Sequence, residues 1–205
     1  IYYGMTGDET WNDTAKGIVD RMNELVLWAD DIAFFPKFIW LPEENLTAQE
    51  RAQAIATMME EGVEEEDANR SLWQTWIITG LAQYYNVSGY EPAKKLAYGL
   101  VNYLRKSKYV EEWKSHFHCI TLGIQGMMEL ALVANDRELA EYARQAYEEA
   151  ISGEKMVAIP SIGYFVNQNS PYYKDDQVRP KMEGCSIADM TALAVKLTEL
   201  GMGDR

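Results

Sequence analysis

The sequence predicts an all-α fold made of helical hairpins, arranged as an incomplete (α/α)6 toroid of about seven helices. Apolar residues recur at spacings of three and four along most of the chain, which is the helical period. A short corner containing Gly or Asn, usually followed by Asp, recurs between the helices. Helices that are apolar on most faces also alternate with helices that have one charged side. A plain helical bundle or an open solenoid is the alternative fold.

The first expected helix covers residues 11–28, where Ile18, Met22, Leu25 and Val26 form one apolar stripe. The same period returns in further stretches at 48–61, 67–86, 92–106, 116–134, 136–151 and 184–200. Residues 30–47 are expected to form a loop. Residues 153–182 contain three prolines and no helical stripe, which predicts a long loop with one short strand pair. Loops of this length in compact domains are often functional, and this one is expected to border the active site.

The repeated corners define the hairpins. They lie at Gly7-Asp8, Ser88-Gly89, Asn135-Asp136 and Gly203-Asp204. Gly or Asn fits the left-handed residue that follows a helix end, and an Asp just after it can cap the next helix. Each corner is therefore expected to join two antiparallel helices.

Alternation of helix surfaces predicts two layers. The helices that begin near residues 67, 116 and 184 are apolar on most faces, whereas those at 92–106 and 136–151 have one charged side. The first group should form the inner layer and the second group the outer layer. The inner helices should then begin on one common face of the molecule. Helix N-termini carry partial positive charge and spare N–H groups, so this face suits polar or anionic ligands.

Composition excludes several functions. The 205 residues include 32 acidic and 19 basic side chains, giving a net charge of −13, which argues against binding to nucleic acid or to an anionic membrane surface. No apolar run approaches the length of about 20 residues that spans a bilayer. Two cysteines are too few for a disulfide scaffold, and 47% hydrophobic residues suffice for a core. Residues 1–205 are expected to form one partial toroid domain. The chain begins at Ile1 without an initiator Met, which predicts that the remainder of a parent chain is missing. The cellular compartment is therefore not predicted.

Candidate ligand-binding residues cluster at the starts of the inner helices. Trp73 and Tyr164 have rings that could stack on a sugar, although aromatic residues at helical spacing also build cores. The full set expected to bind substrate is Arg70 and Trp73 before and within the first inner helix, His116 and His118 at the second, and Tyr164 and Asn167 in the long loop.

A metal site is the second expectation. Glu183 and Cys185 place a carboxylate and a thiol two residues apart at a helix start, and both groups are zinc ligands. The alternative is a capping Glu beside a buried Cys. Cys119 lies within an apolar run and is expected to be a core residue.

Three motifs together resemble a known family. They are SHFHCITLGIQGMMELAL, GYFVN and EGCSIADMTALAVKLTELGMGD, and they span about residues 110–205. They are similar to the α/α-toroid glycoside hydrolases related to the zinc-dependent β-L-arabinofuranosidases. The matching features are His116 at the start of an inner helix, Gly126-Met127-Met128-Glu129-Leu130-Ala131 near its end, and Glu183-Gly184-Cys185 at the start of the next.

The resemblance implies a carbohydrate substrate and a zinc–thiolate retaining mechanism. Glu183 and Cys185 would supply half of the zinc site, and His116 would line the sugar pocket. The family completes the site with a pair of cysteines further along, one of which is the nucleophile. Here those residues would lie beyond Arg205. The catalytic residues stay unassigned, because residues 156–182 contain no Glu that matches the family's acid/base residue.

Three functional hypotheses follow. The first is a glycoside hydrolase-like protein that acts on a carbohydrate in the toroid cleft. The second is a non-catalytic α/α repeat module that binds carbohydrate or protein. The third is a lyase or unsaturated-glycoside hydrolase on the same fold, working through His, Tyr and Asp. Zinc content and glycoside cleavage discriminate among them.

Overall fold

A computed structural model describes residues 2–35, 47–61, 65–107, 110, 117–152, 156–159, 164–167 and 184–203. For residues 65–73 of α4, and for β3 and β4, the backbone alone is described. The all-α class is confirmed: these residues contain eight helices and two short antiparallel hairpins. The elements in chain order are α1 (Tyr2–Thr6), α2 (Glu9–Leu25), β1 (Leu27–Ala29), β2 (Ile32–Phe34), α3 (Ala48–Glu61), α4 (Glu65–Ser88), α5 (Glu91–Lys106), α6 (Phe117–Ala134), α7 (Arg137–Ser152), β3 (Met156–Ile159), β4 (Tyr164–Asn167) and α8 (Gly184–Glu199).

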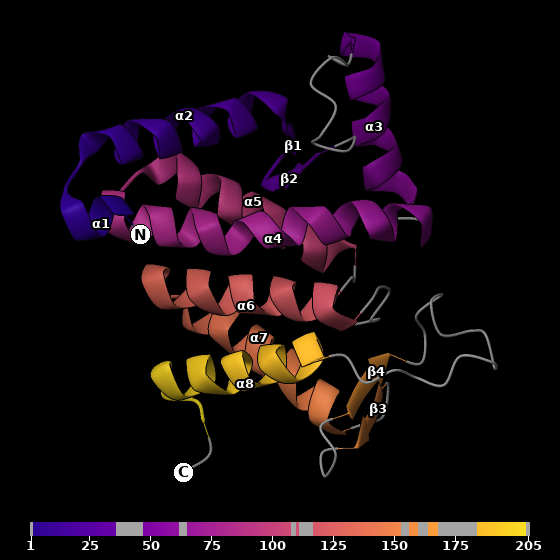
Figure 1. The fold of residues 1–205 in the computed structure, drawn as a ribbon. Coiled ribbons are helices and arrows are strands. Elements are labelled where there is room, and N and C mark those ends of the chain that lie inside the picture. The colour runs from indigo at the N-terminus through magenta and orange to yellow at the C-terminus, as the bar shows by residue number, and fades with distance from the viewer. Residues whose placement is uncertain are drawn as a thin grey trace.

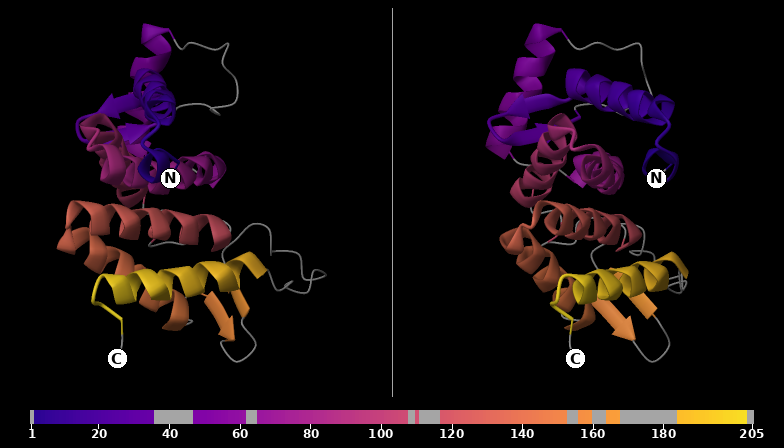
Figure 2. Two further views of the ribbon diagram at one scale, coloured as in Figure 1. Left: turned by 60° about the vertical axis from the view of Figure 1, so that its left-hand side comes forward. Right: turned by 90° about the vertical axis from the view of Figure 1, so that its left-hand side faces the viewer.

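The helices form hairpins stacked in two layers. Figure 1 shows α4, α6 and α8 side by side and running in the same direction, with α2 at one end of the stack and α8 at the other. In Figure 2, α5 and α7 lie in a second layer beside them. The expected arrangement in two layers is therefore confirmed, whereas burial on most faces is found for α6 alone among the described parts of α4, α6 and α8. Helix α6 is buried on most of its faces, whereas α5 and α7 bury mainly one apolar stripe each.

Left-handed residues form the corners, as the sequence predicts. Gly7, Gly89 and Asn135 have φ values of 68°, 66° and 54°. The fourth corner differs from the expectation, because Gly201 rather than Gly203 has the positive φ of 68°. In two corners an Asp caps the next helix: the Asp8 carboxylate accepts from the Thr10 N–H, and that of Asp136 from the Leu139 N–H.

A β-hairpin replaces the expected end of the first helix. Helix α2 stops at Leu25, and β1 pairs with β2 in the register Leu27↔Phe34. The prediction of helix to residue 28 and loop from residue 30 is wrong here. The Asp30-Asp31 pair between two apolar triplets has turn chemistry, and Asp30 has a φ of 55°. Buried Gln74 on α4 fixes the following segment by exchanging hydrogen bonds with the backbone of Phe35.

The second hairpin confirms the strand pair expected within residues 153–182. Strand β3 pairs with β4 in the register Met156↔Asn167 and Ile159↔Tyr164. Strand β4 contacts both α6 and α8. Residues 168–183 of the long loop lie outside the described part of the chain.

Helix α6 is the central element of the core. Gly126 lets it approach α4 closely, since a Cβ there would lie 2.8 Å from Ile78 Cβ. By length and composition α6 is also apolar enough to cross a membrane, the one such helix among the described residues. Because 61% of it is buried inside the molecule, this property is typical of a core helix.

Candidate functional site

A buried carboxylate lies between the N-terminal halves of α6 and α8. Asp189 is 6% exposed, and three side chains of α6 donate to it. The distances are 2.6 Å from His118 Nδ1 to Oδ2, 2.6 Å from Thr121 Oγ1 to Oδ2, and 3.3 Å from Gln125 Nε2 to Oδ1. A buried carboxylate is stable only when such donors replace water, and these three groups do so.

Helical spacing explains how the donors converge. His118, Thr121 and Gln125 are spaced by three and four along α6, so they lie on one face of the helix. Asp189 lies in the second turn of α8, on the side that packs against that face. The cluster therefore depends on the parallel packing of the two inner helices.

The contact with Asp189 determines the tautomer of His118. A carboxylate only accepts hydrogen bonds, so Nδ1 carries the hydrogen and the neutral ring has its lone pair on Nε2. The His118 side chain is 31% exposed, whereas that of Asp189 is 8% exposed. His118 is thus the accessible member of the pair. Its Nε2 can accept a hydrogen bond from a hydroxyl group or take up a proton.

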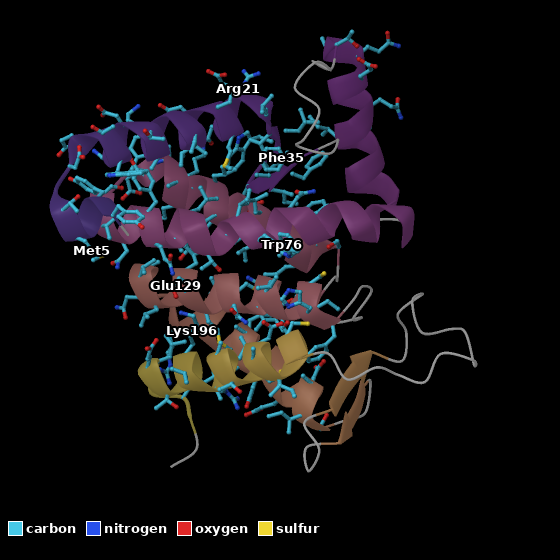
Figure 3. The ribbon with its side chains drawn as sticks, viewed as in Figure 1. Met5, Arg21, Phe35, Trp76, Glu129 and Lys196 are labelled. Atoms are coloured by element: carbon cyan, nitrogen blue, oxygen red, sulfur yellow. The ribbon has the colours of Figure 1, made fainter. Side chains whose placement is uncertain are left out.

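A second polar contact lies further along the same helix pair. Lys196 of α8 forms an ion pair with Glu129 of α6, and Glu129 is 9% exposed. Figure 3 shows these two side chains pointing toward one another between the helices. Lys196 follows Asp189 by about two helical turns. Polar contacts therefore join α6 and α8 at two separate points.

The predicted zinc ligands are described in part. Cys185 is half-buried in the first turn of α8, one turn before Asp189, and Glu183 lies outside the described residues. Within the described ranges, no group of three or more His, Cys, Asp and Glu side chains is placed to hold a metal ion. The zinc site therefore stays a prediction. Cys119 is 5% exposed, which confirms it as a core residue.

For four of the remaining predicted site residues, the structure describes the backbone alone. Tyr164 and Asn167 lie at the two ends of β4, next to α6 and α8. Arg70 and Trp73 lie in the first half of α4, but their side chains are outside the described residues, as is the whole of His116. Trp76 is 42% exposed on the same helix. Of the predicted substrate-binding residues, His118 on α6 and Tyr164 and Asn167 on β4 are therefore described near the contact between α6 and α8, and the full set stays a prediction.

Asp189, Thr121 and Gln125 are absent from the predicted site. The sequence does contain a pattern for them: Asp189 is an acidic residue in the mostly apolar first three turns of its helix, and His118, Thr121 and Gln125 have helical spacing. The sequence does not show that α6 and α8 pack together, and this packing turns two separate patterns into one cluster.

Comparison with known proteins adds no relative. A scan against protein-family models and searches of curated proteins and of solved structures found no match. The resemblance to the α/α-toroid glycoside hydrolases therefore stays an expectation from the sequence motifs.

Proposed function

We propose that this chain is a glycoside hydrolase-like protein that binds a carbohydrate across the N-terminal ends of α4, α6 and α8. The observation that carries the proposal is the hydrogen bond between half-exposed His118 and buried Asp189 at this face. Strand β4, with Tyr164 and Asn167, borders the same face. An orientated imidazole matches the chemistry of sugar hydroxyls, which both donate and accept hydrogen bonds.

The two members of the pair have different roles in this proposal. Asp189 already accepts from three donors, so it holds the ring of His118 and stabilises the imidazolium that forms when Nε2 takes up a proton. Asp189 is thus a positioning residue. His118 would contact the sugar, by a hydrogen bond from a hydroxyl group to Nε2 or by moving a proton to or from it.

Zinc forms a separate part of the proposal. Cys185 and Glu183 are the residues that would bind it, and bound zinc would act as a Lewis acid near the sugar. The roles of His118 and Asp189 do not depend on the metal.

Cleavage of 4-nitrophenyl glycosides tests the proposal, with the β-L-arabinofuranoside first in the panel. We expect release of 4-nitrophenolate by the native full-length protein and a loss of about 100-fold or more in kcat/KM for His118→Ala, since acid–base groups contribute 10²–10⁴-fold. Gln145→Ala, at an exposed position of α7, is the matched control and should leave the rate unchanged.

The other outcomes separate the remaining hypotheses. Saturable binding of the glycosides without turnover, weakened by His118→Ala, would select the non-catalytic binding module. The absence of both binding and turnover would contradict the proposal. Zinc is tested by elemental analysis of the full-length protein, with Cys185→Ser expected to lower the zinc content. Glycoside cleavage by zinc-free chain would favour the hypothesis of a His- and Asp-based lyase or hydrolase.

A further inference from the structure

The three inner helices, α4, α6 and α8, differ from the outer helices in charge. Residues 74 and 76–88 of α4 include no charged side chain, although the chain as a whole has a net charge of −13. Apart from His118, the acidic and basic side chains described on α6, and on α8 before its last residue, are Glu129, Asp189 and Lys196. All three take part in the polar contacts between α6 and α8. By contrast, α5 and α7 carry charged side chains along their lengths.

One side of the inner layer faces away from the outer helices, which Figure 2 shows on its opposite side. Trp76 and Gln83 have helical spacing and share the exposed side of α4. Ala188 and Val195 have the same spacing and share the exposed side of α8. Between them, α6 presents half-buried residues at the same side. We name Trp76, Gln83, His118, Leu122, Ala188 and Val195 the inner face.

Trp76 is a large aromatic side chain of the inner face and is 42% exposed. Its level along the stack follows from the contact of Ile78 with Gly126, because α4 and α6 run in the same direction. Trp76 is therefore level with about residue 124 of α6, which lies about 9 Å beyond His118 along the helix axis. Figure 3 shows Trp76 nearer than Glu129 to the ends where α6 and α8 begin. The inner face thus continues the proposed sugar site beyond the reach of a single sugar ring.

We infer that the ligand is an oligosaccharide of uncharged sugars that runs from His118 over Leu122 and stacks a further sugar ring on Trp76. This inference rests on the proposed function. A flat indole beside an apolar side chain suits the C–H face of a sugar ring. The amide of exposed Gln83, two turns beyond Trp76 on the same side of α4, can both donate to and accept from sugar hydroxyls.

The charge of the inner layer selects the class of sugar. An oligosaccharide of uronic acids carries a carboxylate on each ring and would need arginine or lysine partners. Over the described side chains of α4, α6 and α8, the one lysine or arginine is Lys196, and its ammonium already pairs with Glu129. The net charge of −13 also repels an anionic ligand at long range. An uncharged oligosaccharide meets neither obstacle.

Isothermal titration calorimetry of the full-length protein tests the inference. The probes are methyl glycosides and the matching arabino-, xylo- and cello-trisaccharides. We expect Trp76→Ala to weaken binding of the preferred trisaccharide about tenfold or more, and binding of its methyl glycoside less than about twofold, because the single sugar does not reach the indole. Trp76→Phe keeps a ring and should keep most of the affinity. Trp11→Ala is the matched control, since Trp11 is 49% exposed on α2, outside the inner face.

His118→Ala separates this inference from the proposed function, because it should weaken binding of the methyl glycoside and the trisaccharide alike. If His118→Ala weakens binding but Trp76→Ala binds the trisaccharide as the native protein does, the inference is overturned and the proposed function stands. Equal affinity for tri-galacturonate and for the neutral trisaccharides would also overturn the inference. The absence of binding to every probe would overturn both. Far-UV circular dichroism of each variant separates lost binding from lost folding.

Discussion

At the residue scale, the position of Asp189 ties the stability of the fold to the proposed site. Its carboxylate replaces water with hydrogen bonds from His118, Thr121 and Gln125. Hydrogen bonds to a charged group contribute about 1.5–3 kcal/mol each, and a buried acceptor that loses its donors is destabilising. A change at Asp189 should therefore be detected both in unfolding and in any ligand assay.

Asp189→Asn tests this connection. The amide keeps the shape of the carboxylate but turns an N–H₂ group toward one of the donors, so we expect the free energy of unfolding to fall by about 1–3 kcal/mol. Urea unfolding measures the change. Asp13→Asn, at an exposed position of α2, is the control and should stay within about 0.5 kcal/mol of the native chain. Equal effects at both positions would contradict the positioning role of Asp189.

The contact between Asp189 and His118 cannot be predicted from the sequence. His118 and Cys185 have the side-chain chemistry of sites and are found at helix starts, so the sequence identifies both as candidates. The contact between His118 and Asp189 joins residues 71 positions apart, and it exists only because α8 packs on α6. A pattern within one helix cannot show which helix will face it.

At the element scale, the packing of α4 on α6 depends on one missing side chain. A Cβ on Gly126 would lie 2.8 Å from Ile78 Cβ and 3.4 Å from the Thr79 backbone nitrogen, so the two helices would have to separate. Tight packing of this kind tolerates extra volume poorly.

Gly126→Ala should lower the free energy of unfolding by about 1–3 kcal/mol despite the better helix propensity of Ala. Gly80→Ala is the matched control, because Gly80 is exposed on α4 and a Cβ there would meet nothing within 4 Å. We expect that variant to be more stable than the native chain by about 0.5–1 kcal/mol. Thermal and urea unfolding of the pair measure both changes. A stabilising effect at both positions would refute the close approach.

The accuracy of the sequence predictions also varies with the length of the element. Each of α4, α5, α6 and α7 is long enough for the helical period to dominate, and each is predicted within a few residues. The β1–β2 hairpin is missed because three-residue strands give no period of their own. The apolar stripe predicted for the first helix, which ends at Val26, also runs directly into them. The residues Asp30 and Asp31 carry the turn signal.

At the scale of the whole molecule, charge opposes self-association. Each copy has a net charge of −13, so two copies repel one another at long range.

The two polar contacts between α6 and α8 also restrict the register in which α8 packs along α6. Asp189 meets His118 near one end of the contact, and Lys196 meets Glu129 further along. A slide of α8 by one turn, about 5.4 Å, would break both contacts at once and leave buried charges on both helices. An apolar surface alone would tolerate several such positions. The spacing of the two contacts therefore selects a single register, and that register sets the position of Cys185 relative to the start of α6.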